Sequence, residues 1–118
     1  MEKGSLLAFR SVTKEYPQAD GAVRLAVRDV DLDVASNSVV ALIGRSGSGK
    51  TTLLNLASGI DIPTRGTVRV DGQDLGVLNE HDRTLLRRKT VGIVFQFFHL
   101  LPHLSVEENV ALPEWIEG

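Results

Sequence analysis

The most informative stretch of this chain is residues 39–51, with the sequence Val-Val-Ala-Leu-Ile-Gly-Arg-Ser-Gly-Ser-Gly-Lys-Thr. Its second part, residues 44–51, fits the pattern G-x-x-x-x-G-K-[ST] at each fixed position. Glycines in such a loop let backbone N–H groups approach phosphate oxygens. Lys50 supplies a cation for the β- and γ-phosphates, and Thr51 offers a hydroxyl to Mg²⁺. The pattern predicts a nucleotide-phosphate site without saying which nucleotide it holds.

The segments on both sides of this loop support the same interpretation. The continuous apolar run at 39–43 is typical of a parallel strand that is buried on both faces. Residues 50–58 predict a helix whose positive N-terminus faces the anion, followed by Gly59 in the left-handed conformation. The leucines that we expect on the buried face of this helix are Leu53, Leu54 and Leu56.

Segments typical of strands and helices alternate along the rest of the chain, which favours a layered α/β domain. Further strands are expected at residues 6–12, 23–34, 67–72 and 91–95, with a turn at 17–21. Asn79 and Asp82 have the spacing of a helix N-cap, and this helix would continue to about residue 89. Ser105 and Glu108 form the pattern of a capping box that opens a short helix through about residue 112.

Length, charge and composition exclude several classes of protein. The 118 residues suffice for one small domain. Thirteen basic against fifteen acidic residues give a net charge of −2, which lacks the basic excess of a nucleic-acid binder. With no cysteine, disulfides and zinc-thiolate sites are impossible. The three histidines lack metal-ligand spacing, and no apolar run approaches the roughly 20 residues of a membrane span. We expect a cytosolic chain that is able to dock on a membrane protein.

Several segments together resemble the ATPases of ATP-binding-cassette (ABC) transporters. The similarity covers the phosphate loop through Leu54, and it continues at 56–59, 63–68 and 91–96, the last of which resembles the Q-loop of that family. It extends over about residues 6–113 and is greatest for the branch that serves lipoprotein release and macrolide-type export. The resemblance implies a P-loop NTPase fold. All 118 residues would form the N-terminal part of an ABC ATPase domain, with an antiparallel β subdomain and an incomplete parallel core sheet.

The resemblance also implies roles for individual residues. Tyr16 matches the aromatic residue that stacks on adenine, and Gln96 matches the glutamine that helps to bind Mg²⁺ together with Thr51. ATP and Mg²⁺ are the implied ligands. Residues 97–104 would contact a transmembrane permease on the cytoplasmic face of the membrane, and a second ATPase subunit would complete the dimer. The loop residues expected to bind the nucleotide are Gly44, Arg45, Ser46, Gly47, Ser48, Gly49, Lys50, Thr51 and Thr52.

At three places the chain departs from the family pattern. Asn37 and Ser38 stand where Gly-Glu is usual, and Asn tolerates the positive φ that this turn needs. Arg45 stands where many members have Pro, which removes no phosphate contact. Residues 114–118 fit the pattern poorly.

Other parts of the family's catalytic machinery do not occur in these 118 residues. They contain no L-S-G-G-Q signature, no Walker B strand with its Asp and catalytic Glu, and no switch His. Because hydrolysis needs a second metal ligand and an aligned water, we expect ATP binding with little or no turnover and assign no catalytic residue. Two other functions stay open at this point: a non-catalytic module that docks on a membrane subunit, and another P-loop enzyme such as a small-molecule kinase.

Overall fold

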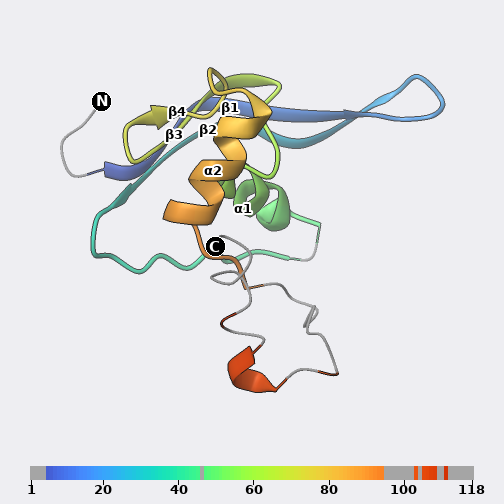
Figure 1. Ribbon diagram of the computed structural model, residues 1–118. Coiled ribbons are helices and arrows are strands. Elements are labelled where there is room, and N and C mark those ends of the chain that lie inside the picture. Colours follow the sequence, from blue (N-terminus) through green and yellow to red (C-terminus); the bar gives the residue numbers. More distant parts are fainter. Residues whose placement is uncertain (1–4, 46, 95–102, 104, 109–110, 112–118) are drawn as a thin grey trace.

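A four-stranded antiparallel sheet is the framework of the fold. The computed structural model describes residues 5–45, 47–94, 103, 105–108 and 111. The strand order is β2-β1-β3-β4. The strands are β1 (Ser5–Pro17), β2 (Val23–Ala35), β3 (Arg65–Val70) and β4 (Gln73–Asp74). The two longer α-helices are α1 (Lys50–Ser58) and α2 (Glu80–Thr90) (Figure 1), and described residues 106–108 are also helical.

The longest element is the hairpin formed by β1 and β2, and its far end projects beyond the helices (Figure 1). Antiparallel pairing places Tyr16 opposite Arg24. The turn is closed where the Gln18 amide donates to the Ala22 carbonyl oxygen at 2.8 Å, with Gly21 at φ +86°. The expected strands at 6–12 and 23–34 and the turn between them are thereby confirmed, although β1 continues five residues further, to Pro17.

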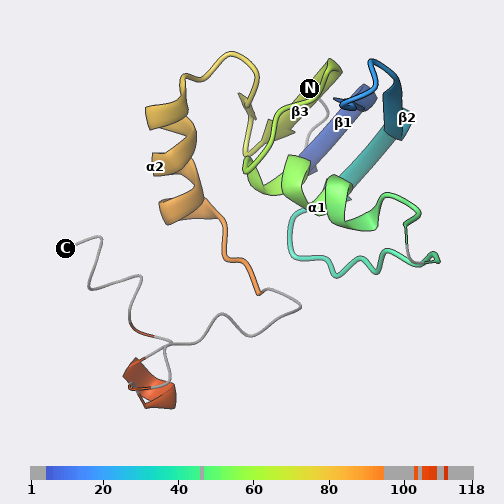
Figure 2. The ribbon, with the colours of Figure 1, turned by 90° about the vertical axis from the view of Figure 1, so that its right-hand side faces the viewer.

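The hydrophobic core joins the sheet to both helices, with α1 beneath β1 and β2 and α2 beside the β3 edge in Figure 2. Leu56 of α1 is completely buried, and Leu53 packs against the core beside it. Leu54 is 59% exposed, so its expected inward orientation is wrong. At 100° per residue, a side chain between two inward positions points to the flank of a helix. The buried apolar side chains of the core cluster are Phe9, Val12, Val27, Leu56, Val68, Val70, Leu75 and Leu86.

Local signals at the element ends behave as the sequence predicts. The Asn79 side chain accepts a hydrogen bond from the Asp82 amide at 2.8 Å, and α2 starts there. Gly59 ends α1 at φ +80°, and Asn37 adopts the expected positive φ of 59°. The capping box also forms, because the Glu108 amide donates to the Ser105 hydroxyl oxygen and the Ser105 amide donates to the Glu108 carboxylate.

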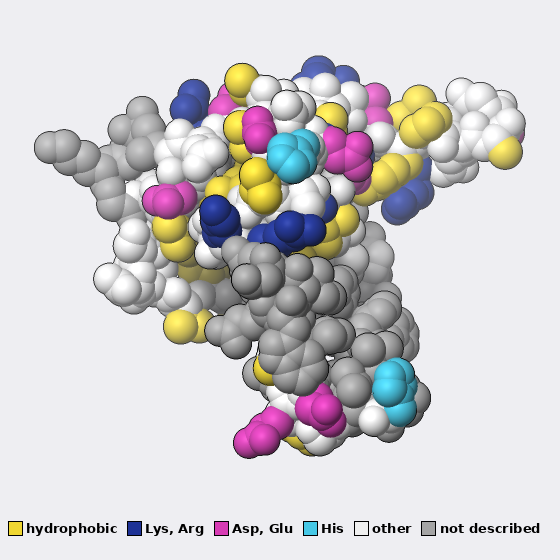
Figure 3. All heavy atoms as spheres, viewed as in Figure 1, with side chains coloured by type: hydrophobic (Ala, Val, Ile, Leu, Met, Phe, Trp, Pro, Cys, Tyr) yellow, Lys and Arg dark blue, Asp and Glu magenta, His cyan; other side chains and the backbone are white. Residues whose placement is uncertain are grey.

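Charges on α2 follow the direction of the helix dipole. Acidic residues occupy its first turn, and Arg87, Arg88 and Lys89 occupy its last turn. In Figure 3, which has the view of Figure 1, acidic side chains lie over the upper part of α2 and basic side chains over its lower end. Each group lies at the end of the helix where it interacts favourably with the partial charge of the backbone. Among the described residues, no helix is long and apolar enough to span a membrane.

Two expected strands do not form. Residues 39–43 and 91–94 have no strand pairing, and Phe95 lies outside the described residues. Val39, Ile43 and Val94 are 100%, 94% and 98% exposed. A strand requires a hydrogen-bonded neighbour, and in the described part of the chain neither segment pairs with one. The antiparallel subdomain is therefore present, whereas the incomplete parallel sheet is not seen among these residues.

Two leucines on α1 provide a matched test of this core. Leu56→Ala should lower the free energy of unfolding by about 2–5 kcal/mol, because Leu56 is completely buried among core side chains. Leu54→Ala removes the same atoms from an exposed position on the same helix and should change it by less than about 0.5 kcal/mol. Urea unfolding of both variants measures the difference, and equal losses would contradict this description of the core.

Candidate functional site

Glycine permits the close contact between the phosphate loop and the sheet. Gly49 precedes α1 at φ +97°, and a Cβ atom on it would lie 2.7 Å from the carbonyl oxygen of Ala26 in β2. Gly47 has φ +82°, and a Cβ there would meet nothing within 4 Å. A Cβ on Gly44 would lie 2.7 Å from the Ser48 hydroxyl. The loop therefore needs glycine at position 49 both for its backbone conformation and for its packing.

The first residues of α1 place two polar groups beside this loop. The Lys50 ammonium donates to the carbonyl oxygen of Gly44, which holds the lysine against the start of the loop. Thr51 follows with an exposed side chain. The first turn of α1 has no acidic residue, so no carboxylate within that turn offsets the positive end of the helix dipole. This arrangement suits an anion.

A pocket of about 550 Å³ joins the phosphate loop to the sheet. It is lined by Tyr16, Arg24, Leu25, Ala26, Gly47, Gly49, Lys50, Thr51, Thr52 and Asn55. The structure therefore brings Tyr16 together with five of the nine loop residues expected to bind the nucleotide. Gly44, Arg45 and Ser48 are described but do not line this pocket. Ser46 and Gln96 lie outside the described residues, as do all of residues 97–104 except His103.

The residues that β2 and the second half of α1 add to the pocket were not predicted from the sequence. Arg24 lies directly opposite Tyr16 in the hairpin. Aligning the two expected strands across the turn at 17–21 could therefore have identified Arg24 as a neighbour of Tyr16. Asn55 follows Thr51 by one turn of α1 and lies on the same side of that helix. Neither residue belongs to the loop pattern, which explains why that pattern alone does not find them.

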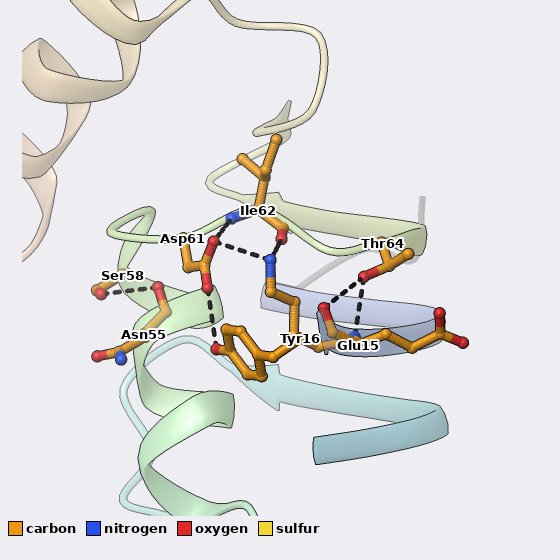
Figure 4. A network of polar contacts seen from close by, with 8 residues as sticks. Glu15, Tyr16, Asn55, Ser58, Asp61, Ile62 and Thr64 are labelled. Carbon is orange, nitrogen blue, oxygen red and sulfur yellow. Dashed lines mark hydrogen bonds and ion pairs between the residues drawn. The ribbon is translucent and has the colours of Figure 1, made fainter. Parts of the chain in front are cut away.

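The position of Tyr16 is fixed by polar contacts, which Figure 4 shows from close by. Its hydroxyl donates to one carboxylate oxygen of Asp61 at 3.0 Å. The Lys14 ammonium donates to the other carboxylate oxygen at 3.0 Å and lies 5.1 Å from the centre of the Tyr16 ring. The Arg24 guanidinium carbon also lies 5.1 Å from that centre. Asp61 was not predicted as a site residue, and it lacks a local signal because its partners are far away in the sequence.

The surroundings of Asp61 favour its ionised form. Partial burial raises the pKa of its carboxyl group, but the hydrogen bonds from Lys14 and from the Ile62 amide lower it. The Tyr16 hydroxyl and the charge of Lys14 lower it further, and the resulting pKa lies below the ordinary value of 3.8. A carboxylate with three donors is held in its charged form by those donors.

This pKa predicts how Asp61 contributes to stability at different pH. A lowered pKa in the folded state gives stability that is fully present above the ordinary value of 3.8 and is lost as the pH falls through the folded value. We expect Asp61→Asn to lower the free energy of unfolding at neutral pH, with a difference from wild type that narrows toward about pH 3. Urea unfolding across this range measures the difference.

The control for this pH series is Asp20→Asn in the exposed hairpin turn, where an asparagine oxygen can still accept from the Ala22 amide. It should change the unfolding free energy little at each pH. A gap between Asp61→Asn and wild type that stays constant with pH would contradict the ionised network around Asp61.

The glycine contact is tested by a second pair of variants. Gly49→Ala should lower the free energy of unfolding by clearly more than about 1 kcal/mol. The alanine would have an unfavourable positive φ, and its Cβ would also collide with the Ala26 carbonyl oxygen. Gly47→Ala shares the positive φ but enters open space, so its loss should be about 1 kcal/mol. Thermal unfolding compares the two, and equal losses would show that the contact with β2 is unimportant.

Comparisons with known proteins give the family. The family model of ABC transporters matches residues 27–117. The lipoprotein-releasing system ATP-binding protein LolD of Xylella fastidiosa is 42% identical over 116 residues, covering 98% of this chain and 48% of LolD. The macrolide export ATP-binding/permease protein MacB of Shigella flexneri is 42% identical over 113 residues, covering 96% of this chain and 17% of MacB. The methionine import ATP-binding protein MetN 2 of Burkholderia mallei is 44% identical over 115 residues, covering 98% of this chain and 28% of MetN 2.

A solved structure is similar over nearly the whole chain. The ATP-binding cassette MJ0796, in a dimeric post-hydrolysis state bound to ADP and Pi, superimposes with a TM-score of 0.86 at 36% identity. The similarity covers 95% of this chain and 48% of MJ0796, so the chain spans about half the length of that protein and of LolD. The ABC ATPase fold expected from the sequence is confirmed. The chain belongs to the ABC transporter family.

Proposed function

We propose that this chain binds ATP with Mg²⁺ in the pocket between the phosphate loop and Tyr16, as the nucleotide-binding part of an ABC transporter. One observation carries the proposal: Tyr16 on β1 and Lys50 at the start of α1 line the same pocket although they are far apart in the sequence. A pocket with a cationic loop at one place and an aromatic ring at another matches a ligand that has both phosphates and a base.

Each part of the pocket supports a different part of this ligand. Backbone N–H groups of the loop, the N-terminus of α1 and the Lys50 ammonium would bind the phosphates. The Tyr16 ring would support adenine by stacking, which uses the face of the base rather than its hydrogen-bonding edge. Arg45, Ser46, Ser48 and Gly44 would shape the loop, with Gly47, Gly49 and Thr52 closest to the phosphates.

Mg²⁺ fits the donor set, provided that the nucleotide supplies most of its ligands. Among the described residues, no group of three or more His, Cys, Asp or Glu side chains could hold a metal ion. The Thr51 hydroxyl is a hard oxygen ligand on the rim of the pocket, and Gln96 is the second candidate. When bound, Mg²⁺ would neutralise phosphate charge, and Thr51 would hold it beside the loop.

Hydrolysis and transport are proposals for a protein that also carries the rest of the family's domain. The chain covers 48% of LolD, and its own sequence offers no Walker B carboxylate or catalytic base. We infer that these 118 residues bind ATP with little or no turnover. The family match favours this function over a small-molecule kinase.

The transport partner is a further proposal. We propose that residues 97–104 contact a transmembrane permease from the cytoplasmic side, and that a second ATPase subunit completes the dimer. The dimeric state of MJ0796 supports the second part of this proposal. LolD and MacB, named for lipoprotein release and macrolide export, support an export-type system. MetN 2, which is named for methionine import, has a similar identity to this chain. Sequence identity therefore does not distinguish an export system from an import system.

ATP binding is tested by a pair of lysine variants. Lys50→Ala should weaken ATP binding about ten- to hundredfold, because a charge-assisted contact with the phosphates is lost. Lys89→Ala removes an equal charge from the exposed last turn of α2 and should leave the affinity within about twofold. Isothermal titration with MgATP measures both variants. Equal ATP affinities of the Lys50 variant and wild type would show that the phosphates do not bind at this loop.

A further inference from the structure

We infer that Asp61 is a positioning residue for the nucleotide base, because it anchors the Tyr16 ring to the end of the helix whose other end binds the phosphates. The inference rests on the proposed ATP site and adds a residue to it. Asp61 does not line the pocket and would not touch the ligand. Its effect would pass through Tyr16 alone.

The contacts hold Tyr16 from two directions. The Asp61 carboxylate receives the Tyr16 hydroxyl at 3.0 Å, which fixes the polar end of the ring. Lys14 bridges Asp61 and the ring, with its ammonium 3.0 Å from the carboxylate and 5.1 Å from the ring centre. The Lys14 side chain is 14% exposed and that of Asp61 is 29% exposed, so both lie partly out of water. An ion pair in such a place is screened less than one on the open surface.

Asp61 is itself fixed to α1. Its backbone amide donates to the carbonyl oxygen of Asn55 at 3.2 Å, and its carboxylate accepts from the Ile62 amide at 2.9 Å. Lys14 also donates to the carbonyl oxygen of Ile62 at 2.9 Å, which ties β1 to the segment after α1 (Figure 4). The ring of Tyr16 is therefore placed relative to the C-terminal end of α1, while Lys50 and Thr51 stand at its N-terminal end.

This arrangement fixes the spacing between base and phosphates. One rigid helix bears the phosphate-binding groups at its N-terminal end, and the segment directly after its C-terminal end carries Asp61, the anchor of the aromatic ring. Without Asp61, the Tyr16 side chain would keep its ring but lose the contact that limits its rotation. Affinity for a ligand with a base should then fall, while affinity for a base-free phosphate chain should stay.

The experiment compares ATP with inorganic tripolyphosphate by isothermal titration of the full chain with Mg²⁺. Asp61→Ala should weaken ATP binding about fivefold and leave tripolyphosphate binding unchanged. Tyr16→Phe keeps the ring without the hydroxyl and should cause a similar loss. Asp61→Asn retains an oxygen that can accept from Tyr16, so it should restore part of the ATP affinity that Asp61→Ala loses.

A double-variant cycle separates positioning from a general structural role. The double variant Tyr16→Phe with Asp61→Ala should bind ATP no more weakly than either single variant. Each substitution removes the same hydrogen bond, the one between the Tyr16 hydroxyl and the Asp61 carboxylate. Additive losses, or equal weakening of ATP and tripolyphosphate by Asp61→Ala, would overturn the inference. Should Asp61→Ala fail to fold, Tyr16→Phe and Asp61→Asn carry the same test, and an unchanged ratio of ATP to tripolyphosphate affinity in Tyr16→Phe would overturn it.

The wild-type chain distinguishes the failure of this inference from that of the proposed function. If it binds neither ligand, the proposed nucleotide site is wrong and the inference falls with it. If it binds ATP and tripolyphosphate equally well, the phosphate site is supported, but Tyr16 does not contribute to binding the base. The inference about Asp61 is then wrong.

Discussion

The close approach of Gly49 to β2 is the constraint on which the candidate site depends. A side chain at this position would lie 2.7 Å from the Ala26 carbonyl oxygen, and the backbone adopts φ +97° there. Because glycine allows both, α1 can begin directly beside the sheet. The phosphate loop then opens toward the same side of the hairpin that carries Tyr16. A bulkier residue would separate the loop from the aromatic ring, and the two would no longer share a pocket.

Helix α1 connects the core, the phosphate loop and the aromatic ring. Leu56 in its middle is completely buried, which fixes the helix against the sheet. Its first residues present Lys50 and Thr51 to the pocket, and the segment that follows its end supplies Asp61 to Tyr16. Leu53 and Ala57 pack against the same core, and since the rise of a helix is constant, at about 1.5 Å per residue, these contacts together set the position of both ends. The stability of the core and the geometry of the site are therefore linked.

Features encoded by neighbouring residues could be predicted from the sequence. The loop pattern located α1, and the Asn79 and Ser105 caps located helix starts, because each signal and its structural consequence lie within a few residues. The segments 39–43 and 91–94 carry the composition of buried strands, yet a parallel strand forms only beside suitable neighbours. Asp61 could not be predicted as a site residue for a similar reason, because it contacts Tyr16, which lies 45 positions away in the sequence. Composition alone does not show which distant residues meet.

The charge around the pocket also depends on which residues the fold brings together. The chain carries a net charge of −2, which by itself would suggest a weak repulsion of anionic ligands. The described residues that line the pocket nevertheless include Arg24 and Lys50 and no acidic residue. Asp61, the carboxylate that accepts from Tyr16, is paired with Lys14 at 3.0 Å, which offsets its charge at the ring. The positive N-terminus of α1 adds to this local excess. An acidic chain can therefore present a cationic pocket to a nucleotide, because the field at short range depends on the placement of charges more than on their sum.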